Sequence, residues 1–224
     1  MDAEGFAREL PRLFDDFPRS EQPRGRRFDD VVAGVPNLAE ENNLALVNLA
    51  ASLLEPGESY VEAGTYMGAS LIAAMRGNED TGFVALDYFS FGPTEVKGRK
   101  LPEASPAALE ANLERFGAHG ATILEGDTLE LLRGGALDGR RVGVFYYDAS
   151  HAYEDTVGSL RALEPHLADH ALLLVDDHDW EDVERATRDY VDGQPKAQML
   201  LEIGGERKGL PQWWEGVAVI AWEA

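Results

Sequence analysis

The chain has 224 residues, of which 44% are hydrophobic, and its 41 acidic and 20 basic residues give a formal net charge of −21. That size and composition favour a single folded domain and disfavour nucleic acid as a partner, since phosphate backbones are bound by lysine and arginine. The sequence has no cysteine, which excludes disulfides and cysteine nucleophiles, and it shows neither a signal-peptide pattern nor an apolar run of the roughly 20 residues that span a bilayer, so we expect a cytoplasmic protein without a membrane partner.

Residues 1–38 are expected to form a helical extension or cap ahead of a main domain that spans residues 39–224. Four apolar residues near the start recur at helical spacing and predict an amphipathic helix over roughly residues 3–17: Leu10, Leu13, Phe14 and Phe17. A connection rich in proline, glycine and arginine follows over residues 18–27, and it is the only candidate for a local basic patch. An apolar face within residues 37–57 predicts a second helix, which Pro56 and Gly57 stop.

From residue 58 onward, short apolar runs alternate with helical patterns. Strands are predicted at residues 59–64, 83–89, 121–127, 141–150, 171–177, 197–203 and 216–224. Helices are predicted between them at residues 70–75, 105–117, 128–134, 152–167 and 180–193. This alternation predicts an α/β, Rossmann-like fold with a mostly parallel seven-stranded sheet and helices on both faces. The last two strands have no helix between them, so the last strand should be antiparallel.

The turn after the first predicted strand carries the segment E-A-G-T-Y-M-G-A-S, residues 62–70. Ligands of open α/β sheets bind beyond the carboxyl ends of the strands, where glycines let a ligand approach the backbone. The glycines also have an explanation without a ligand: Gly64 can serve the turn alone, and Gly68 can serve helix packing alone. The spacing differs from the dinucleotide fingerprint G-x-G-x-x-G, and the charge of Glu62 would repel a pyrophosphate and suit a cationic ligand.

Two further strand ends carry single aspartates. Asp87 ends the second strand, where a carboxylate can accept both hydroxyls of a ribose; the alternative is a solvated or helix-capping residue. Asp127 ends the third strand, where it either accepts a hydrogen bond from an adenine amino group or caps the helix at residues 128–134.

Three more aspartates stand at the ends of the fourth and fifth strands: Asp148 on the fourth, and Asp176 and Asp177 on the fifth. Neighbouring parallel strands lie roughly 5 Å apart, so three carboxylates there repel one another unless they are protonated or bridged by a cation. Carboxylate oxygens of this kind suit Mg²⁺. The alternative is that Asp177 caps the next helix and that Asp148 alone touches a ligand.

These segments resemble the motifs of a known family. V-E-A-G-T-Y-M-G-A-S, L-D-Y-F-S, L-E-G-D-T, Y-Y-D-A-S-H-A-Y-E-D-T and L-L-L-V-D-D-H-D-W are similar to class I S-adenosylmethionine-dependent methyltransferases. The resemblance covers about residues 40–222 and is strongest to the metal-dependent, macrocin-type O-methyltransferases of sugars and antibiotics. The chain departs from that pattern at Ala149, where relatives often have glycine, and at residues 168–170, where they often have a Gly-Gly turn.

The resemblance implies a role for each motif. It places S-adenosylmethionine beside Glu62, Gly64, Thr65, Tyr66, Gly68, Ser70, Asp87, Asp127 and Asp148, with Asp87 on the ribose and Asp127 by the adenine. It makes Asp148, Asp176 and Asp177 the ligands of Mg²⁺. It makes His151 and Asp148 the catalytic residues, with His151 as general base for a hydroxyl proton. His178 lies beside the aspartate pair and is a rival for the role of base or ligand.

The implied function is methyl transfer to a hydroxyl of a small molecule, a sugar moiety or a secondary metabolite such as an antibiotic, by an enzyme that forms homo-oligomers. The long segment 88–106 is either a lid, with Phe89 and Phe91 over the site, or a plain surface loop. Trp213 and Trp214 either form an acceptor wall or belong to the core. Two other functions stay open: an oxidoreductase with a nucleotide cofactor, and a non-catalytic S-adenosylmethionine-binding or scaffold protein.

Overall fold

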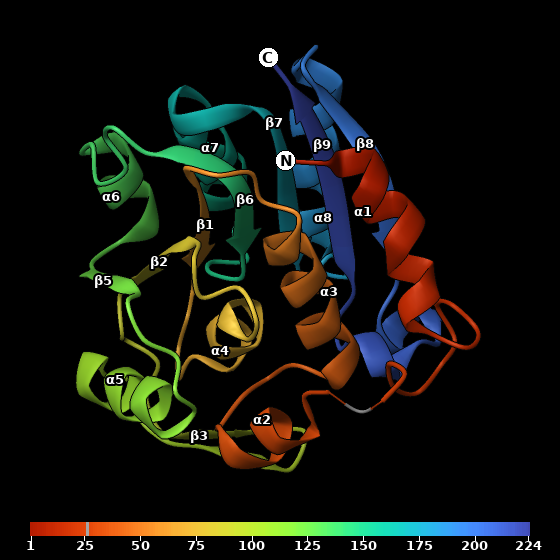
Figure 1. Cartoon of the computed structure of the whole chain (residues 1–224), viewed down its shortest axis with the longest axis vertical. Coiled ribbons are helices and arrows are strands. Elements are labelled where there is room, and N and C mark those ends of the chain that lie inside the picture. The colour runs from red at the N-terminus through yellow and green to blue at the C-terminus, as the bar shows by residue number, and fades with distance from the viewer. Residues whose placement is uncertain (26) are drawn as a thin grey trace.

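A seven-stranded sheet in the order β5-β2-β1-β6-β7-β9-β8 forms the centre of the computed structural model, which describes residues 1–25 and 27–224 (Figure 1). Its strands are β1 Glu58–Ala63, β2 Gly82–Asp87, β5 Thr122–Glu125, β6 Arg141–Tyr147, β7 Leu167–Asp176, β8 Ala197–Ile203 and β9 Val217–Glu223. Strands β5, β2, β1, β6 and β7 pair in parallel, whereas β9 pairs antiparallel with both β7 and β8. The predicted mostly parallel sheet with an antiparallel last strand is therefore confirmed.

Helices cover both faces of this sheet (Figure 1). They are α1 Ala3–Glu9, α2 Asp29–Gly34, α3 Glu41–Ser52, α4 Ala69–Met75, α5 Pro106–Arg115, α6 Thr128–Arg133, α7 Tyr153–Leu163 and α8 Glu181–Gly193. Short 3₁₀ turns lie at η1 Leu10–Leu13, η2 Glu164–His166, η3 Glu206–Lys208 and η4 Pro211–Trp213. No helix within the described part of the chain is long and apolar enough to cross a bilayer.

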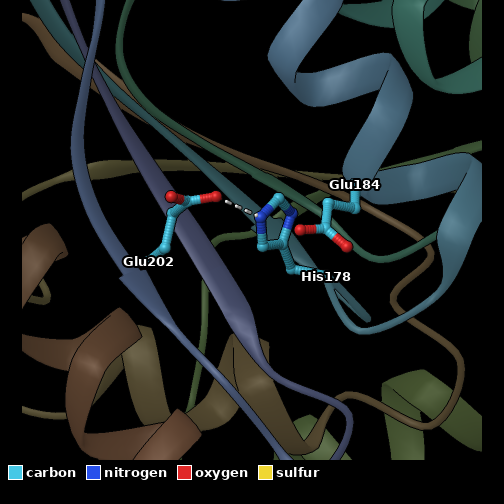
Figure 2. Close-up of side chains that lie close together, drawn as sticks. All are labelled: His178, Glu184 and Glu202. Carbon is cyan, nitrogen blue, oxygen red and sulfur yellow. Dashed lines mark hydrogen bonds and ion pairs between the residues drawn. The ribbon is translucent and has the colours of Figure 1, made fainter. Parts of the chain in front are cut away.

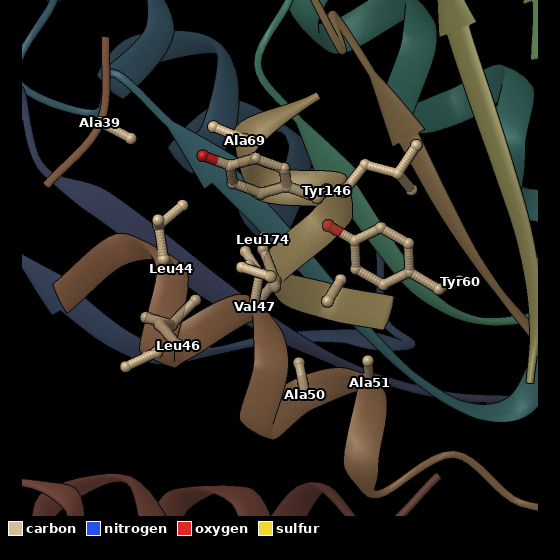
Figure 3. Close-up of a cluster of buried hydrophobic side chains, with 14 of the residues drawn as sticks. Ala39, Leu44, Leu46, Val47, Ala50, Ala51, Tyr60, Ala69, Tyr146 and Leu174 are labelled. Atoms are coloured by element: carbon tan, nitrogen blue, oxygen red, sulfur yellow. The ribbon is translucent and has the colours of Figure 1, made fainter. Parts of the chain in front are cut away.

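Two buried clusters form because successive strand residues point to opposite faces of the sheet. Tyr60 on β1 and Tyr146 on β6 face α3 and α4, in a cluster that includes Leu44 and Val47 (Figure 3). Their neighbours along the strands belong to the other cluster, which packs beneath α6, α7 and α8. The five central strands are thus covered on both sides, as their nearly continuous apolar sequences predict.

The N-terminal region differs from its prediction. The helix predicted over residues 3–17 ends as an α-helix at Glu9, because Pro11 has no N–H to continue the ladder and the chain tightens into η1. Helix α2 was not predicted. Phe14 packs against Trp213 with ring centroids 5.4 Å apart, and the Trp213 indole N–H donates to the Pro18 carbonyl at 2.8 Å. The first 38 residues therefore share one core with the rest of the chain.

Arg26, part of the arginine-bearing connection at residues 18–27, lies outside the described residues. The segment 88–106 holds a small antiparallel hairpin, β3 Thr94–Val96 and β4 Arg99–Leu101, where the sequence predicted irregular structure. Three-residue strands are too short to give a clear alternating pattern in sequence.

Strand register brings the polar strand ends into one row. Ala63 on β1 pairs with Leu86 on β2 and with Tyr147 on β6, and Tyr147 pairs with Val175 on β7. The residues that follow these four are Asp87, Gly64, Asp148 and Asp176, so they lie side by side along the carboxyl edge of the sheet.

Gly64 is the tightest point of this row. It has φ of +86°, and a Cβ built there would lie 1.8 Å from the carbonyl oxygen of Asp148. We expect Gly64→Ala to lower the free energy of unfolding by about 2–4 kcal/mol, since strand β1 or β6 must shift to relieve the clash. Urea denaturation measures the change.

Gly57 provides the matched control for this substitution. It has φ of +84°, but nothing lies within 4 Å of a Cβ built there. Gly57→Ala should therefore cost only about 1 kcal/mol, the backbone penalty of a left-handed alanine. Equal losses at the two glycines would contradict the close approach of Gly64 to Asp148.

Candidate functional site

A cavity of about 500 Å³ lies at the carboxyl edge of the sheet, a size typical of small-molecule sites. The predicted residues that line it are Gly64, Thr65, Tyr66, Ser70, Asp87, Asp127, Asp148, His151 and Asp177. Of the other predicted residues, Glu62, Gly68 and Asp176 stand behind the cavity wall, and His178 lies on another side of β7. The sequence did not single out Pro36, Asn37, Leu38 and Ala39, which line the cavity from the N-terminal region.

The loop between β1 and α4 takes a conformation that its sequence allows. Tyr66 has φ of +51° and Gly68 has φ of +88°. Gly68 also lies against α5, where a Cβ would come 2.5 Å from Leu109 Cδ1. Gly68 therefore serves helix packing, and Gly64 serves the close approach of two strands.

Asp87 fixes this loop from β2. One of its carboxylate oxygens accepts from the Tyr66 backbone N–H at 2.6 Å, and the other accepts from the Phe89 N–H at 2.5 Å. Each oxygen keeps a second lone pair for a ligand hydroxyl. Asp87 thus both shapes the loop and lines the cavity.

Asp127 caps helix α6, because one carboxylate oxygen accepts from the Glu130 N–H at 2.9 Å. The same residue lines the cavity. The two interpretations left open by the sequence are compatible, since the second carboxylate oxygen stays available.

Glu62 is fully buried between β1 and α4 and does not line the cavity. Its carboxylate accepts from the Tyr60 hydroxyl at 2.8 Å and from the Ser70 hydroxyl at 2.8 Å. Burial raises the pKa of Glu62 to about 7, against an ordinary value of 4.5. Glu62 therefore fixes Ser70 from within the core, and its predicted place beside a cofactor stays a prediction.

The raised pKa of Glu62 predicts a pH-dependent stability. The folded protein holds this proton more tightly than the unfolded chain, so the stabilising effect is present below pH 4.5 and is lost as pH rises toward 7. A shift of this size corresponds to about 3 kcal/mol. The free energy of unfolding, measured in urea, should therefore fall between pH 5 and pH 8. We expect this fall to be smaller in Glu62→Gln, which cannot ionise at this position.

Glu125→Gln, which removes one charge from the exposed end of β5, is the control for that experiment. An identical pH slope in the Glu62→Gln variant and the wild type would contradict the burial of an ionisable group at Glu62.

Three carboxylates gather where β6 and β7 end. Burial raises the pKa of Asp148 well above its usual range and that of Asp176 to about 8, and the negative charge of neighbouring aspartates adds to both shifts. Asp176 accepts from the Tyr146 hydroxyl and, at 3.4 Å, from Asn43 Nδ2 on α3. Asp177 has φ of +55°, so the chain leaves the extended conformation of β7 at this residue, and its side chain lines the cavity.

His151 and Asp177 form a pair at the mouth of the cavity. His151 Nε2 lies 2.7 Å from Asp177 Oδ2, and this hydrogen bond raises the pKa of His151. The imidazole also stacks on Trp180, with ring centroids 4.8 Å apart. Because Nε2 faces the carboxylate, Nδ1 is the ring atom left to exchange a proton with a ligand.

His178 belongs to a different cluster. Its Nε2 lies 2.9 Å from Glu202 on β8, and Glu184 on α8 lies on the other side of the ring (Figure 2). These three residues are the only described set of metal-ligand side chains whose donor atoms all lie within 4.8 Å of one another. Arg188 Nη2 already bridges the two glutamates, at 3.0 Å from Glu184 and 2.9 Å from Glu202. Arg188 thus already supplies a cation to this cluster, and His178 is not among the residues that line the cavity.

The hairpin segment and the β8–β9 connection form the outer wall. Tyr88 and Phe91 line the cavity and are 65% and 40% exposed. Trp214 also lines it, whereas Trp213 is fully buried against Phe14. Trp213 thus belongs to the core, whereas Trp214 is buried and reaches the cavity; its role in an acceptor wall stays a prediction.

A family model described as a methyltransferase domain matches residues 61–178, just over half of the chain. Among curated proteins no match was found. The similar solved structures described next are at most 21% identical to this chain, so they show its fold alone.

Three such structures illustrate the likeness. The apo TDP-rhamnose 3'-O-methyltransferase of calicheamicin biosynthesis is 21% identical, with 99% of this chain and 94% of that chain covered and a TM-score of 0.58. The O-methyltransferase TomG of Streptomyces achromogenes, in complex with S-adenosylmethionine, is 15% identical, with coverages of 100% and 91% and a TM-score of 0.60. A methyltransferase of Podospora anserina bound to S-adenosylhomocysteine is 16% identical, with coverages of 100% and 97% and a TM-score of 0.61.

Proposed function

The chain belongs to the methyltransferase domain family, and from this premise we propose that it transfers the methyl group of S-adenosylmethionine to a hydroxyl of a small molecule. The observation that carries the proposal is the cavity at the carboxyl edge of the sheet, where Asp87 and the His151–Asp177 pair line one space. Several solved structures with this fold are described as O-methyltransferases, which supports oxygen as the acceptor atom.

The lining residues fit S-adenosylmethionine. Asp87 offers carboxylate lone pairs to ribose hydroxyls, and Asp127 offers its free oxygen to the amino group of an adenine. The carboxylates of Asp148 and Asp177 favour a ligand that carries a positive charge. When bound, S-adenosylmethionine supplies an electrophilic methyl carbon on a sulfonium sulfur.

The carboxylates at the ends of β6 and β7 are the donor type that a divalent cation takes, but the oxygens of Asp148, Asp176 and Asp177 do not all lie within 4.8 Å of one another in the described structure, so a bound cation would have to draw them together. Asp148, Asp176 and Asp177 are oxygen donors, and burial, together with the charge of the neighbouring aspartates, raises the pKa values of Asp148 and Asp176. When bound there, Mg²⁺ would lower the pKa of an acceptor hydroxyl.

In the proposed reaction, the side chains that line the cavity would have two roles: they position the acceptor and they remove its proton. The cavity walls hold the acceptor oxygen in line with the methyl group, and positioning of this kind accounts for much of the rate of a bimolecular transfer. Nδ1 of His151 accepts the hydroxyl proton, while the carboxylate of Asp177 orients the imidazole through Nε2.

Calorimetric titration with S-adenosylmethionine, S-adenosylhomocysteine and NADH, each with Mg²⁺ and with EDTA, tests the proposal. We expect micromolar binding of the first two and no binding of NADH. Binding of NADH alone would favour an oxidoreductase, and no binding of any of the three would overturn the methyltransferase proposal.

A second arm tests catalysis and metal together. Methyl transfer to phenols and glycosides is followed by mass spectrometry, with Mg²⁺ and with EDTA. Turnover that EDTA abolishes supports a metal at the three aspartates, turnover that EDTA leaves unchanged contradicts it, and cofactor binding without any transfer favours a non-catalytic binding protein.

A further inference from the structure

We infer that the acceptor is a phosphate-free molecule, uncharged or positively charged, and that the cavity excludes nucleotide sugars and coenzyme A esters. The inference rests on the proposed function, because it names the class of acceptor that the same cavity takes. It is carried by the charges that line the cavity, by the ion pairs at its mouth and by the side chains of its outer wall.

The cavity is lined by five aspartates: Asp87, Asp127, Asp148, Asp155 and Asp177. His151 is the one basic side chain among the described lining residues, and it is already paired with Asp177 at 2.7 Å. Burial raises the pKa of Asp148 and of Asp176 behind the wall, so these two carboxyls add little negative charge near neutral pH. The negative charge of the cavity lies chiefly on Asp87, Asp127 and Asp155. Carboxylates gathered around one partly enclosed space attract cations and repel a diphosphate.

The cations nearest the mouth are held by carboxylates. Lys97, at the tip of the β3–β4 hairpin, lies 2.5 Å from Glu215 and also pairs with Glu206. Arg207 lies 3.1 Å from the other oxygen of Glu215.

Arg99 on β4 is held in the same way. It pairs with Glu40 and donates to the Ala39 carbonyl at 2.8 Å and to the Asn37 side-chain oxygen at 3.0 Å. A phosphate at the mouth would have to take these cations from partners that already satisfy them, and the displaced carboxylates would remain beside it.

These ion pairs also build the wall. The Lys97 ammonium lies 4.1 Å and the Arg99 guanidinium 4.8 Å from the ring centroid of Trp214, so both cations hold this indole in place. Phe91 packs edge-on against Tyr66 with ring centroids 5.2 Å apart, and Leu38 lines the cavity with them. Such a wall suits an aromatic or alicyclic ring that carries the reacting hydroxyl.

The first test is calorimetric titration of the S-adenosylhomocysteine-loaded protein with thymidine diphosphate and with coenzyme A, with Mg²⁺ and with EDTA. We expect no saturable binding of either compound below 1 mM. Saturable binding of either with a Kd below 1 mM would overturn the inference.

The second test frees the cations. In Glu215→Gln, Lys97 and Arg207 lose a shared carboxylate, so we expect this variant to bind thymidine diphosphate saturably with a Kd below 1 mM, which the wild type does not do. Glu223→Gln, at the exposed end of β9, is the matched control for loss of one charge. No gain in a Glu215→Gln variant that melts at the wild-type temperature would overturn the electrostatic argument.

Failure of this inference and failure of the proposed function are distinguishable. Binding of S-adenosylhomocysteine is measured first in the same cell, and its absence contradicts the proposed function. The titration with thymidine diphosphate reports the charge of the cavity whether or not the cofactor binds.

Discussion

His151→Ala is expected to lower kcat for methyl transfer by about 10²–10⁴-fold, the usual effect of removing a general base. The affinity for S-adenosylmethionine should change less than threefold, because the residues proposed to hold the ribose and the adenine stand elsewhere: Asp87 ends β2, and Asp127 lies just after β5. Turnover of the best acceptor among the phenols and glycosides, together with calorimetry of cofactor binding, gives both numbers.

His170→Ala is the control for this variant, since His170 is exposed on β7 outside the cavity. Asp177→Asn is informative beside it, because the amide keeps the shape of the side chain and loses the charge that orients Nε2 of His151. A kcat of His151→Ala within threefold of the wild type would rule out His151 as the base.

Asp87→Ala is expected to weaken S-adenosylmethionine binding by a hundredfold or more. Two effects act together: the ribose loses its carboxylate, and the backbone N–H groups of Tyr66 and Phe89 lose their acceptor. Each lost charge-assisted hydrogen bond is worth about 1.5–3 kcal/mol, so the sum reaches this range without any further change. Calorimetric titration measures the loss.

Asp87→Asn separates the two effects, because the amide oxygen can still accept from one backbone N–H. We expect it to recover part of the affinity that alanine loses. Asp127→Ala, at the proposed adenine end of the cavity, should weaken S-adenosylmethionine binding less than Asp87→Ala. The Asp127 carboxylate accepts from one backbone N–H, on α6, whereas that of Asp87 accepts from two. Wild-type affinity of the Asp87→Ala variant would contradict a ribose site at Asp87.

The central sheet could be predicted from sequence because its strands are continuous apolar runs separated by helical patterns. The β-α-β connections make these strands parallel, so their carboxyl ends share one edge of the sheet, where Asp87, Asp148 and Asp176 form a row. Predictions made at strand ends depend only on this local order, which is why most of the predicted residues line the cavity.

Side-chain direction was harder to predict. Glu62 was predicted to stand beside a cofactor, which stays a prediction; it lies two residues after Tyr60 and therefore points to the same face of the sheet, beneath α4. That alternation was available in the sequence. His178 follows Asp177 directly, yet Asp177 contacts His151 whereas His178 contacts Glu202 on β8.

Contacts between distant segments could not be predicted from the sequence. Nothing local in Pro36–Asn37–Leu38–Ala39 indicates that it reaches the cavity, since its position is set by Arg99 on the β3–β4 hairpin, about 60 residues later in the chain. The two cations over Trp214 come from the same hairpin, which the sequence showed only as a long segment rich in glycine and proline.

The way the N-terminal residues join the core has a consequence for how acceptor preference can be inherited or engineered. Trp213 is anchored to Pro18, and its neighbour Trp214 lines the cavity together with Leu38, so the start and the end of the chain jointly shape the side of the cavity where we propose that the acceptor binds. A chimera between two relatives that exchanges only the central sheet would carry over the cofactor half and leave the acceptor half behind. Transfer of acceptor preference requires both terminal segments to move as a pair, together with the hairpin that holds them.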